Sequence, residues 1–114
     1  ITMTDTFTLK RHDTRPFLDV NLQEGGEYID LTATSGVTFT MIDVDTKIIK
    51  VSAASCSIVD AETGAVRYSW ASINTDTAGV FLGEFQVTYT NGDKMTVPVS
   101  EVLVIVILED YDNA

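Results

Sequence analysis

The sequence predicts an all-β fold, either an antiparallel sandwich or a barrel. Apolar and polar residues alternate in short runs along most of the chain, which is the period of a half-buried strand. Turn-forming residues interrupt these runs every several residues, and no segment has the spacing of an amphipathic helix. The pattern predicts eight or nine short strands in a single domain over residues 1–114.

The first half of the chain contains four alternating runs. Threonine and aspartate occupy many of the alternate positions, which is typical of a strand with one solvated face. A turn at residues 24–27 separates the second run from the third. The predicted inward residues are Phe7 and Leu9; Leu18, Val20 and Leu22; Ile29 and Leu31; and Val37, Phe39 and Met41.

Residues 47–60 form a longer run in which the inward row changes parity. Ile49, Val51 and Ala53 lie on one row, and Ala54, Cys56 and Ile58 lie on the other. One extra residue moves every later side chain to the opposite face of a strand. We therefore expect a bulge, or a bend between two sheets, near Ala53 and Ala54.

The second half begins with a turn at residues 60–64 and continues with two aromatic-rich strands. Asn91-Gly92 predicts a hairpin turn, because both residues accept positive φ. Pro98 cannot donate a ladder hydrogen bond, so its strand is predicted to end there or to lie at an edge. The predicted inward residues are Val66, Tyr68 and Trp70; Phe81, Gly83, Phe85, Val87 and Tyr89; and Met95, Val97 and Val99.

One run, Val102 to Leu108, is apolar on both rows. Either Leu103, Ile105 and Ile107 face the core, or the alternate row of Val102, Val104, Val106 and Leu108 does. The remaining row requires a cover, which is a segment of the same chain or a neighbouring subunit. Burying four such side chains contributes several kcal/mol at about 25 cal/mol per Å². The sequence favours the subunit, with Val102, Val104, Val106 and Leu108 in the interface.

Composition limits the partners of this chain. Its net charge of −10 argues against nucleic acid and against an anionic membrane surface, since both attract clustered Lys and Arg. Its one cysteine, Cys56, excludes an internal disulfide and fits folding in the cytoplasm. The first residues have no basic end followed by an apolar run, so they predict no signal peptide.

No set of residues in the sequence predicts catalysis, a cofactor or a metal. His12 lies among charged turn residues without a nucleophile motif nearby, and Cys56 lies on an alternating strand, as a small core residue does. Asp43 and Asp45 resemble part of a calcium loop, but the glycine and distal glutamate of that loop are missing. A turn between strands explains both aspartates.

Several residues near the start of the chain are candidates for contacts with a partner. Phe17 and Tyr28 are aromatic side chains on predicted outward rows, and the segment from Arg11 to Phe17 carries two arginines. Arg15 is a candidate for an interfacial ion pair. We therefore add Arg11, Arg15, Phe17 and Tyr28 to the predicted interface.

Several segments together resemble the immunoglobulin-like domain of phage baseplate upper proteins. The opening Asp13-Thr14, Pro16 and Leu18 is similar to the start of that domain, although His12 replaces a frequent glycine. The resemblance continues in the same order and spacing through residues 29–32, 37–41, 59–60, 64–70, 76–79, 84–85 and 92–98.

This resemblance implies an immunoglobulin-like antiparallel β-sandwich and a structural role in a virion. The chain would be an adaptor in the tail or baseplate, or a capsid decoration protein, with no active site. Its implied partners are other virion proteins and further copies of itself, assembled in the host cytoplasm. The alternative is an immunoglobulin-like module that binds carbohydrate or a host surface through its loops.

Overall fold

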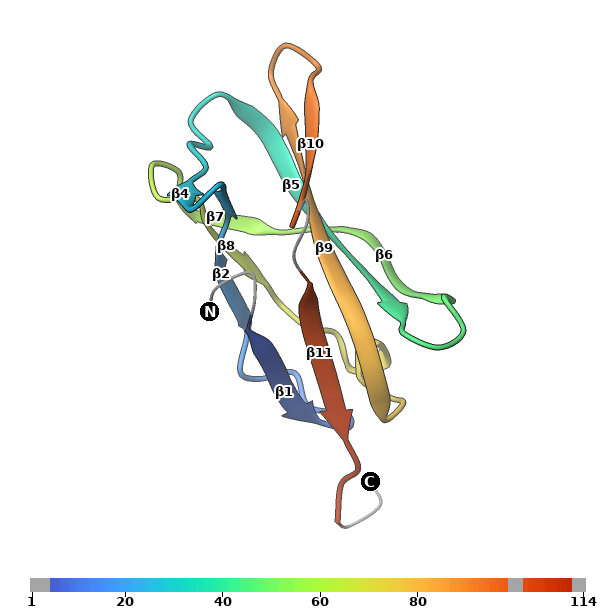
Figure 1. Ribbon diagram of the computed structural model, residues 1–114. Coiled ribbons are helices and arrows are strands. Elements are labelled where there is room, and N and C mark those ends of the chain that lie inside the picture. Colours follow the sequence, from blue (N-terminus) through green and yellow to red (C-terminus); the bar gives the residue numbers. More distant parts are fainter. Residues whose placement is uncertain (1–4, 99–101, 112–114) are drawn as a thin grey trace.

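Strands make up most of the protein in the computed structural model, which describes residues 5–98 and 102–111 (Figure 1). The all-β prediction is confirmed. The described residues form eleven strands, and one short 3-10 helix, η1 (Ser72–Asn74), precedes β9. Val99, a predicted inward residue, lies outside the described residues.

The larger sheet has six strands in the order β1-β11-β9-β5-β6, and β10 pairs with β9 beyond the end of β11. β10 ends just before Pro98, as predicted. The strands of this sheet are β1 (Thr6–Lys10), β5 (Thr34–Asp43), β6 (Ile49–Ser55), β9 (Gly79–Tyr89), β10 (Lys94–Val97) and β11 (Leu103–Leu108).

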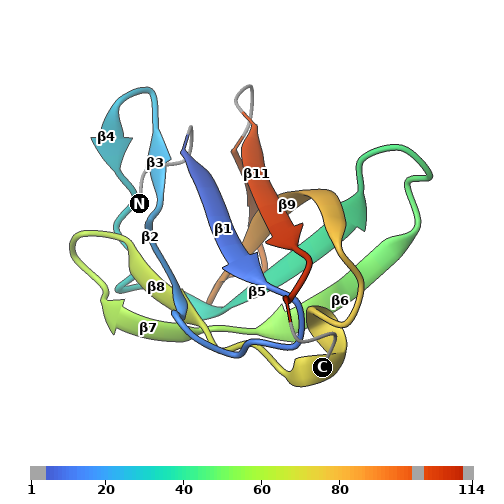
Figure 2. The ribbon, with the colours of Figure 1, turned by 90° about the horizontal axis from the view of Figure 1, so that it is seen from below.

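A smaller sheet contains β2 (Leu18–Asn21), β8 (Ala65–Tyr68) and β7 (Ser57–Asp60), in that order. Figure 2 shows these three strands gathered on one side of the molecule. A two-stranded hairpin, β3 (Gln23–Glu24) and β4 (Glu27–Tyr28), turns at the predicted glycine pair. Ile29 and Leu31 are buried as predicted, but they lie in irregular chain after β4 rather than in a longer strand.

The sequence predicts wholly antiparallel pairing, and one strand pair departs from it. β1 runs parallel to β11, with Phe7 opposite Ile105 and Leu9 opposite Ile107. Every other strand pair of the described chain is antiparallel. Because β1 and β11 lie at opposite ends of the sequence, no tight turn dictates their relative direction.

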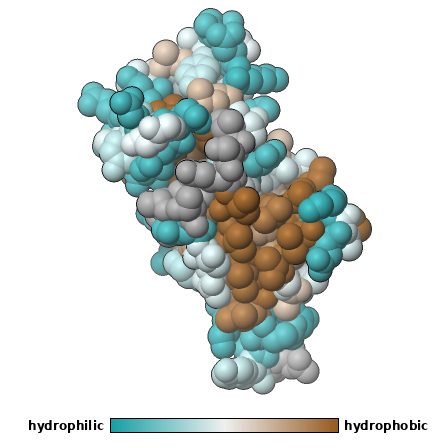
Figure 3. Space-filling model, in the orientation of Figure 1, coloured by the Kyte–Doolittle hydropathy of each residue, from teal (hydrophilic) through white to brown (hydrophobic). Residues whose placement is uncertain are grey.

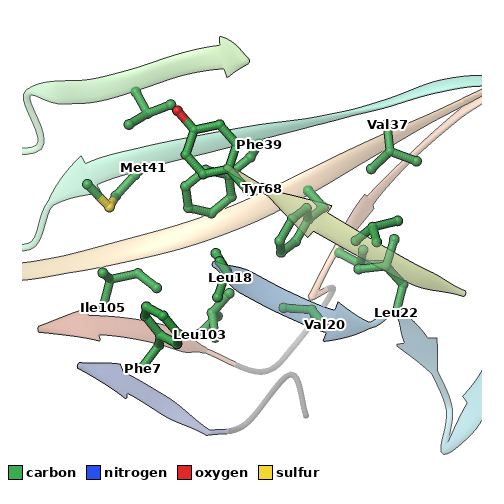
Figure 4. Close-up of a cluster of buried hydrophobic side chains, with 14 of the residues drawn as sticks. Phe7, Leu18, Val20, Leu22, Val37, Phe39, Met41, Tyr68, Leu103 and Ile105 are labelled. Carbon is green, nitrogen blue, oxygen red and sulfur yellow. The ribbon is translucent and has the colours of Figure 1, made fainter. Parts of the chain in front are cut away.

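Aromatic rings join the two sheets. Phe39 of β5 is fully buried, and its ring centroid lies 4.9 Å from that of Tyr68 and 5.1 Å from that of Phe85. Trp70 meets both Phe39 and Tyr68 edge-on. Figure 4 shows Phe39 and Tyr68 among aliphatic side chains of both sheets. The predicted inward aromatic residues Tyr68, Trp70, Phe81 and Phe85 therefore lie in the core.

The predicted change of parity is present where the chain leaves one sheet for the other. Ala53 has a φ of 46°, the β5–β6 register shifts there, and β7 begins in the smaller sheet two residues after β6 ends. Val51 is buried, but Ile49 is exposed, so the prediction that Ile49 faces inward is wrong; a register shift next to it in β6 reverses its row. Ile58 lies opposite the buried Val66 and therefore faces the same side, but it is 39 % exposed because β7 is an edge strand.

Buried hydrogen bonds fix the loop between β8 and β9. The Tyr68 hydroxyl donates to Asn74 Oδ1 at 2.6 Å, and the Ala71 N–H donates to the same oxygen at 2.8 Å. The Thr75 hydroxyl donates to the carbonyl oxygen of Asp13 at 2.9 Å. Because Asn74 and Thr75 are buried, these bonds satisfy groups that water does not reach.

Gly83 of β9 allows the Phe39 ring to lie against the sheet. A Cβ atom at Gly83 would lie 2.8 Å from Phe39 Cε1, closer than two carbon atoms can approach. We predict that Gly83→Ala lowers the free energy of unfolding by about 1–3 kcal/mol in urea titrations, because it overpacks the core. Gly36→Ala in β5 is the matched control, because nothing lies within 4 Å of that Cβ. Equal stability of the two variants would contradict this packing.

Candidate interaction surface

β11 has one buried row and one outward row, as the first of the two sequence alternatives states. Leu103, Ile105 and Ile107 are at most 2 % exposed and belong to the core. Val104 and Val106 lie on the opposite face and are half-buried. Val102, just before the strand, and Leu108, at its end, are 51 % and 45 % exposed.

The neighbouring strands extend this apolar row across the sheet. Residues that lie opposite each other on paired strands project from the same face. By register, Val80 of β9 lies beside Val106 and Leu82 lies beside Val104. Ile42 of β5 follows beside Leu82, and Ile49 of β6 lies beside Ile42. We call this set the apolar face: Ile42, Ile49, Val80, Leu82, Val102, Val104, Val106 and Leu108.

The apolar face is open to solvent on the side that Figure 3 shows, where brown side chains form one patch over β11 and β9. Val80 is 42 % exposed and Ile49 is 57 % exposed. No strand of the described chain covers these residues. A contiguous apolar patch on a soluble domain marks an interaction site more often than scattered apolar residues do.

A hollow of about 210 Å³ lies at one end of the apolar face. Its lining includes the apolar side chains of Leu82, Ile42, Val102 and Pro98, together with Thr40 and Glu84. Most of its lining is apolar, so it fits an aliphatic side chain of a partner better than a polar group.

Few charges lie on the outward side of the larger sheet. Registers place Lys10 beside Leu108, Lys94 beside Thr88 and Glu84 beside Thr40. Among the described residues, these three are the charged ones on the outward rows of β1, β5, β9, β10 and β11. The chain as a whole carries a net charge of −10. The acidic residues therefore lie mainly elsewhere, and contact through this face does not require burying them.

The other predicted interface residues lie apart from the apolar face. Arg11 is half-buried: its Nε donates to the Asp76 carbonyl oxygen at 2.9 Å, and it pairs with Glu109 at 3.3 Å. These contacts tie the first loop to neighbouring segments of the same chain. Tyr28 is 57 % exposed in the β3–β4 hairpin.

Arg15 and Phe17 belong to a cluster at the smaller sheet. The guanidinium groups of Arg15 and Arg67 lie 5.0 Å and 4.8 Å from the centroid of the Phe17 ring. Arg67 also forms two hydrogen bonds to the Asp19 carboxylate, at 2.7 Å and 3.2 Å. Cation–π contacts within the chain thus already occupy the Phe17 ring.

The residues weighed for chemistry have structural roles in the described chain. Asp43 Oδ1 accepts the backbone N–H groups of Asp45 and Thr46, and these bonds lower the pKa of the Asp43 carboxyl group. That pattern is an aspartate turn, as expected. His12 is exposed in a turn with a φ of 71°. In the residues that the structure covers, no three His, Cys, Asp or Glu side chains are grouped to hold a metal.

Cys56 is a half-buried thiol packed against the core. Burial raises its pKa from 9.0 to about 12, because the interior disfavours the thiolate. The thiolate is the reactive form, so this cysteine lacks the environment of a nucleophile.

A scan against protein-family models finds no match for this chain, and a search of curated proteins finds none either. None of the described segments is a helix of the length and apolar character that crossing a membrane requires.

The sequence predicts the β11 part of the apolar face but not the part on the neighbouring strands β9, β5 and β6. Leu82 shares its row with the polar residues Glu84, Gln86 and Thr88, and Ile49 was predicted to face inward. Only the register of β9 against β5 and β11 shows that Leu82, Ile42 and Val104 are adjacent. An apolar residue on an otherwise polar outward row is the signal that could have indicated it.

We predict that aspartate has different effects at two adjacent positions of β11. Ile105→Asp buries a charge in the core and should unfold the protein, because that costs several kcal/mol without a partner. Val104→Asp should fold, losing about 1 kcal/mol from the poor strand propensity of aspartate. Circular dichroism and thermal melting check both. Equal stability of the two variants would mean that the inward row is assigned incorrectly.

We predict that Cys56 reacts slowly with a thiol reagent at pH 8. A pKa near 12 instead of 9.0 lowers the thiolate fraction, so labelling of native protein should be at least about a hundredfold slower than labelling in urea. Absorbance of the released thiol-reagent product gives both rates. Native labelling as fast as that of the unfolded chain would contradict the burial of this thiol.

Proposed function

We propose that this chain is an immunoglobulin-like β-sandwich that serves as a structural protein of a tailed phage. It would be an adaptor in the tail or baseplate, or a decoration protein on the capsid. It would act by protein–protein contacts with other virion proteins and with further copies of itself, and would have no enzymatic activity. Assembly would take place in the host cytoplasm.

Strand order supports the immunoglobulin-like part of the proposal. In the immunoglobulin sandwich, the second, fifth and fourth main strands share one sheet, and the third, sixth and seventh share the other. Here β2, β8 and β7 form the smaller sheet, and β5, β9 and β11 lie together in the larger one. β6 extends the larger sheet beside β5, as an additional strand does in variable-type domains.

The apolar face is the single observation that carries the functional proposal. It is a contiguous set of β-branched and leucine side chains on four neighbouring strands of one sheet, with few charges among them. A rigid surface of this kind suits docking, because association orders few additional side chains. Weak contacts suffice in a particle, where many copies engage at once.

The segments that resemble the immunoglobulin-like domain of phage baseplate upper proteins support the choice of a virion. They include the Asp13-Thr14 turn before Pro16 and the Gly64–Trp70 stretch. In the structure, the Gly64–Trp70 stretch contains β8 and two of the core aromatic residues. The matching residues thus include core positions and not only exposed loops.

The second candidate is a module that binds carbohydrate or a host surface, and one observation favours it. Tyr28 is 57 % exposed at a hairpin, where an aromatic ring can stack on a sugar. A glycan array with the wild type and Tyr28→Ala tests this function. A glycan signal that the substitution removes would favour the binding module.

The test of the virion proposal measures incorporation into particles. We expect mass spectrometry of purified particles to find the wild-type chain in multiple copies. Val104→Asp should fold and yet be depleted at least about tenfold, because a carboxylate on the apolar face opposes burial. Ser69→Asp, which adds the same charge at an exposed position beyond β8, is the control and should be retained.

Two results would contradict the proposal. One is the absence of the wild-type chain from particles whose genome encodes it. The other is incorporation of Val104→Asp at the wild-type level, which would show that the apolar face is not the docking surface.

A further inference from the structure

Two charges of opposite sign stand at opposite ends of the apolar face. Ile105 is opposite Phe7 of β1 and also opposite Phe81 of β9, so these three residues mark one level across the sheet. Lys10 follows Phe7 by three residues, and Glu84 follows Phe81 by three residues. Because β1 is parallel and β9 antiparallel to β11, Lys10 and Glu84 lie on opposite sides of that level.

Each charge lies about 10 Å along the strands from the level of Ile105, at about 3.4 Å per residue. Within one chain they are therefore about 20 Å apart along the strands and two strand spacings apart across the sheet. In the part of the chain that the structure describes, Glu84 has no ion-pair partner. Lys10 Nζ lies 3.9 Å from the centroid of the Tyr111 ring and forms no described ion pair.

We infer that the partner of the apolar face is a second copy of this chain, packed face to face about a two-fold axis level with Ile105. The axis runs across the strands, so strands of the two copies point in opposite directions. This inference rests on the proposed use of the apolar face for docking. It names the partner and fixes the orientation of the pair.

Charge complementarity selects this arrangement. A two-fold axis at the level of Ile105 moves Glu84 of each copy to the level of Lys10 of the other copy. Glu84 and Lys10 of the other copy then remain two strand spacings, about 10 Å, apart across the sheet and about 10 Å apart between the stacked sheets, so about 14 Å separates their backbones. This exceeds the Debye length of about 10 Å at 0.1 M salt, so each pair attracts across the contact mainly at low salt. The opposite orientation, with strands of the two copies parallel, would bring Glu84 to the level of Glu84.

The same axis brings two exposed apolar side chains of each copy toward the hollow of the other. Val80 and Leu108 are exposed on the Lys10 side of the Ile105 level, and the hollow beside Leu82 and Val102 is on the Glu84 side. The pair thus brings the exposed Val80 and Leu108 of each copy to the level of the hollow of the other. An isologous contact requires this kind of self-complementary surface.

The area of the apolar face limits the affinity of the two copies for each other. Its rows extend about 20 Å along the strands and about 14 Å across them, which gives a footprint of about 300 Å² per copy. A stable complex buries about 800 Å² per partner. One such contact is therefore weak in solution, and it becomes effective where a particle holds many copies close together.

The test uses two double variants that keep the net charge of −10. Glu84→Lys with Lys10→Glu exchanges the two charges of the inferred pair, so attraction across the axis is preserved. Glu84→Lys with Lys94→Glu makes the same exchange with a lysine that lies opposite Thr88, on the Glu84 side of the axis. In this second variant, the lysine introduced at position 84 would face Lys10 of the other copy and repel it.

Sedimentation equilibrium of the full chain at low salt, from micromolar to about millimolar concentration, measures self-association. We expect the wild type and the Lys10 exchange to form dimers with dissociation constants that agree within about threefold. The Lys94 exchange should bind about tenfold more weakly, as Coulomb's law gives for two such pairs in water-like surroundings. Circular dichroism verifies that every variant is folded.

A wild type that stays monomeric over this range overturns the inference, and so do two double variants with equal dissociation constants. The particle experiment is a separate readout. If the exchanges fail but Val104→Asp is still depleted from particles, the apolar face docks on another virion protein and the proposed function stands. If Val104→Asp is incorporated normally while the dimer forms in solution, the proposed function fails instead.

Discussion

The fold depends on one strand that is apolar on both faces. β11 is paired on both edges, to β1 and to β9, so its backbone hydrogen bonds hold the first and last strands of the chain in one sheet. Its inward side chains fill the core beneath Phe39 and Gly83, and its outward side chains supply much of the apolar face. Only the inward row is needed to bury the core, so the outward row requires a reason outside this fold.

The sequence alone was enough to assign the inward row of each strand in which apolar and polar residues alternate strictly. The rows of Phe39, Tyr68 and Phe85 could be assigned because a period of two fixes which side chains meet the core. The parallel β1–β11 pair could not be predicted, because it joins residues about 100 positions apart with no turn between them. Ile49 was misplaced because a bulge at an edge strand reverses the rows without changing the composition.

The apolar face was predictable only in part, because part of it forms only through the register between strands. Val102 to Leu108 stands out because both rows are apolar, whereas Leu82 and Ile42 become part of a patch only through register. Arg11 and Phe17 looked available for partners, but contacts with Glu109, Arg15 and Arg67 engage them within the chain. Sequence patterns report which side chains face outward and not what they already contact.

Electrostatics and packing agree on how such a domain can assemble. A net charge of −10 weakens the association of separate copies in solution, while a nearly uncharged apolar face would let them meet in the proposed particle, where many copies lie close together. In the proposed assembly, the outward side of β11 is covered by a neighbouring protein surface. A cryo-electron microscopy map of the intact particle tests it most directly. We expect the map to show Val104 and Val106 against a neighbouring protein surface; both side chains facing open solvent in every copy would rule out a covered β11.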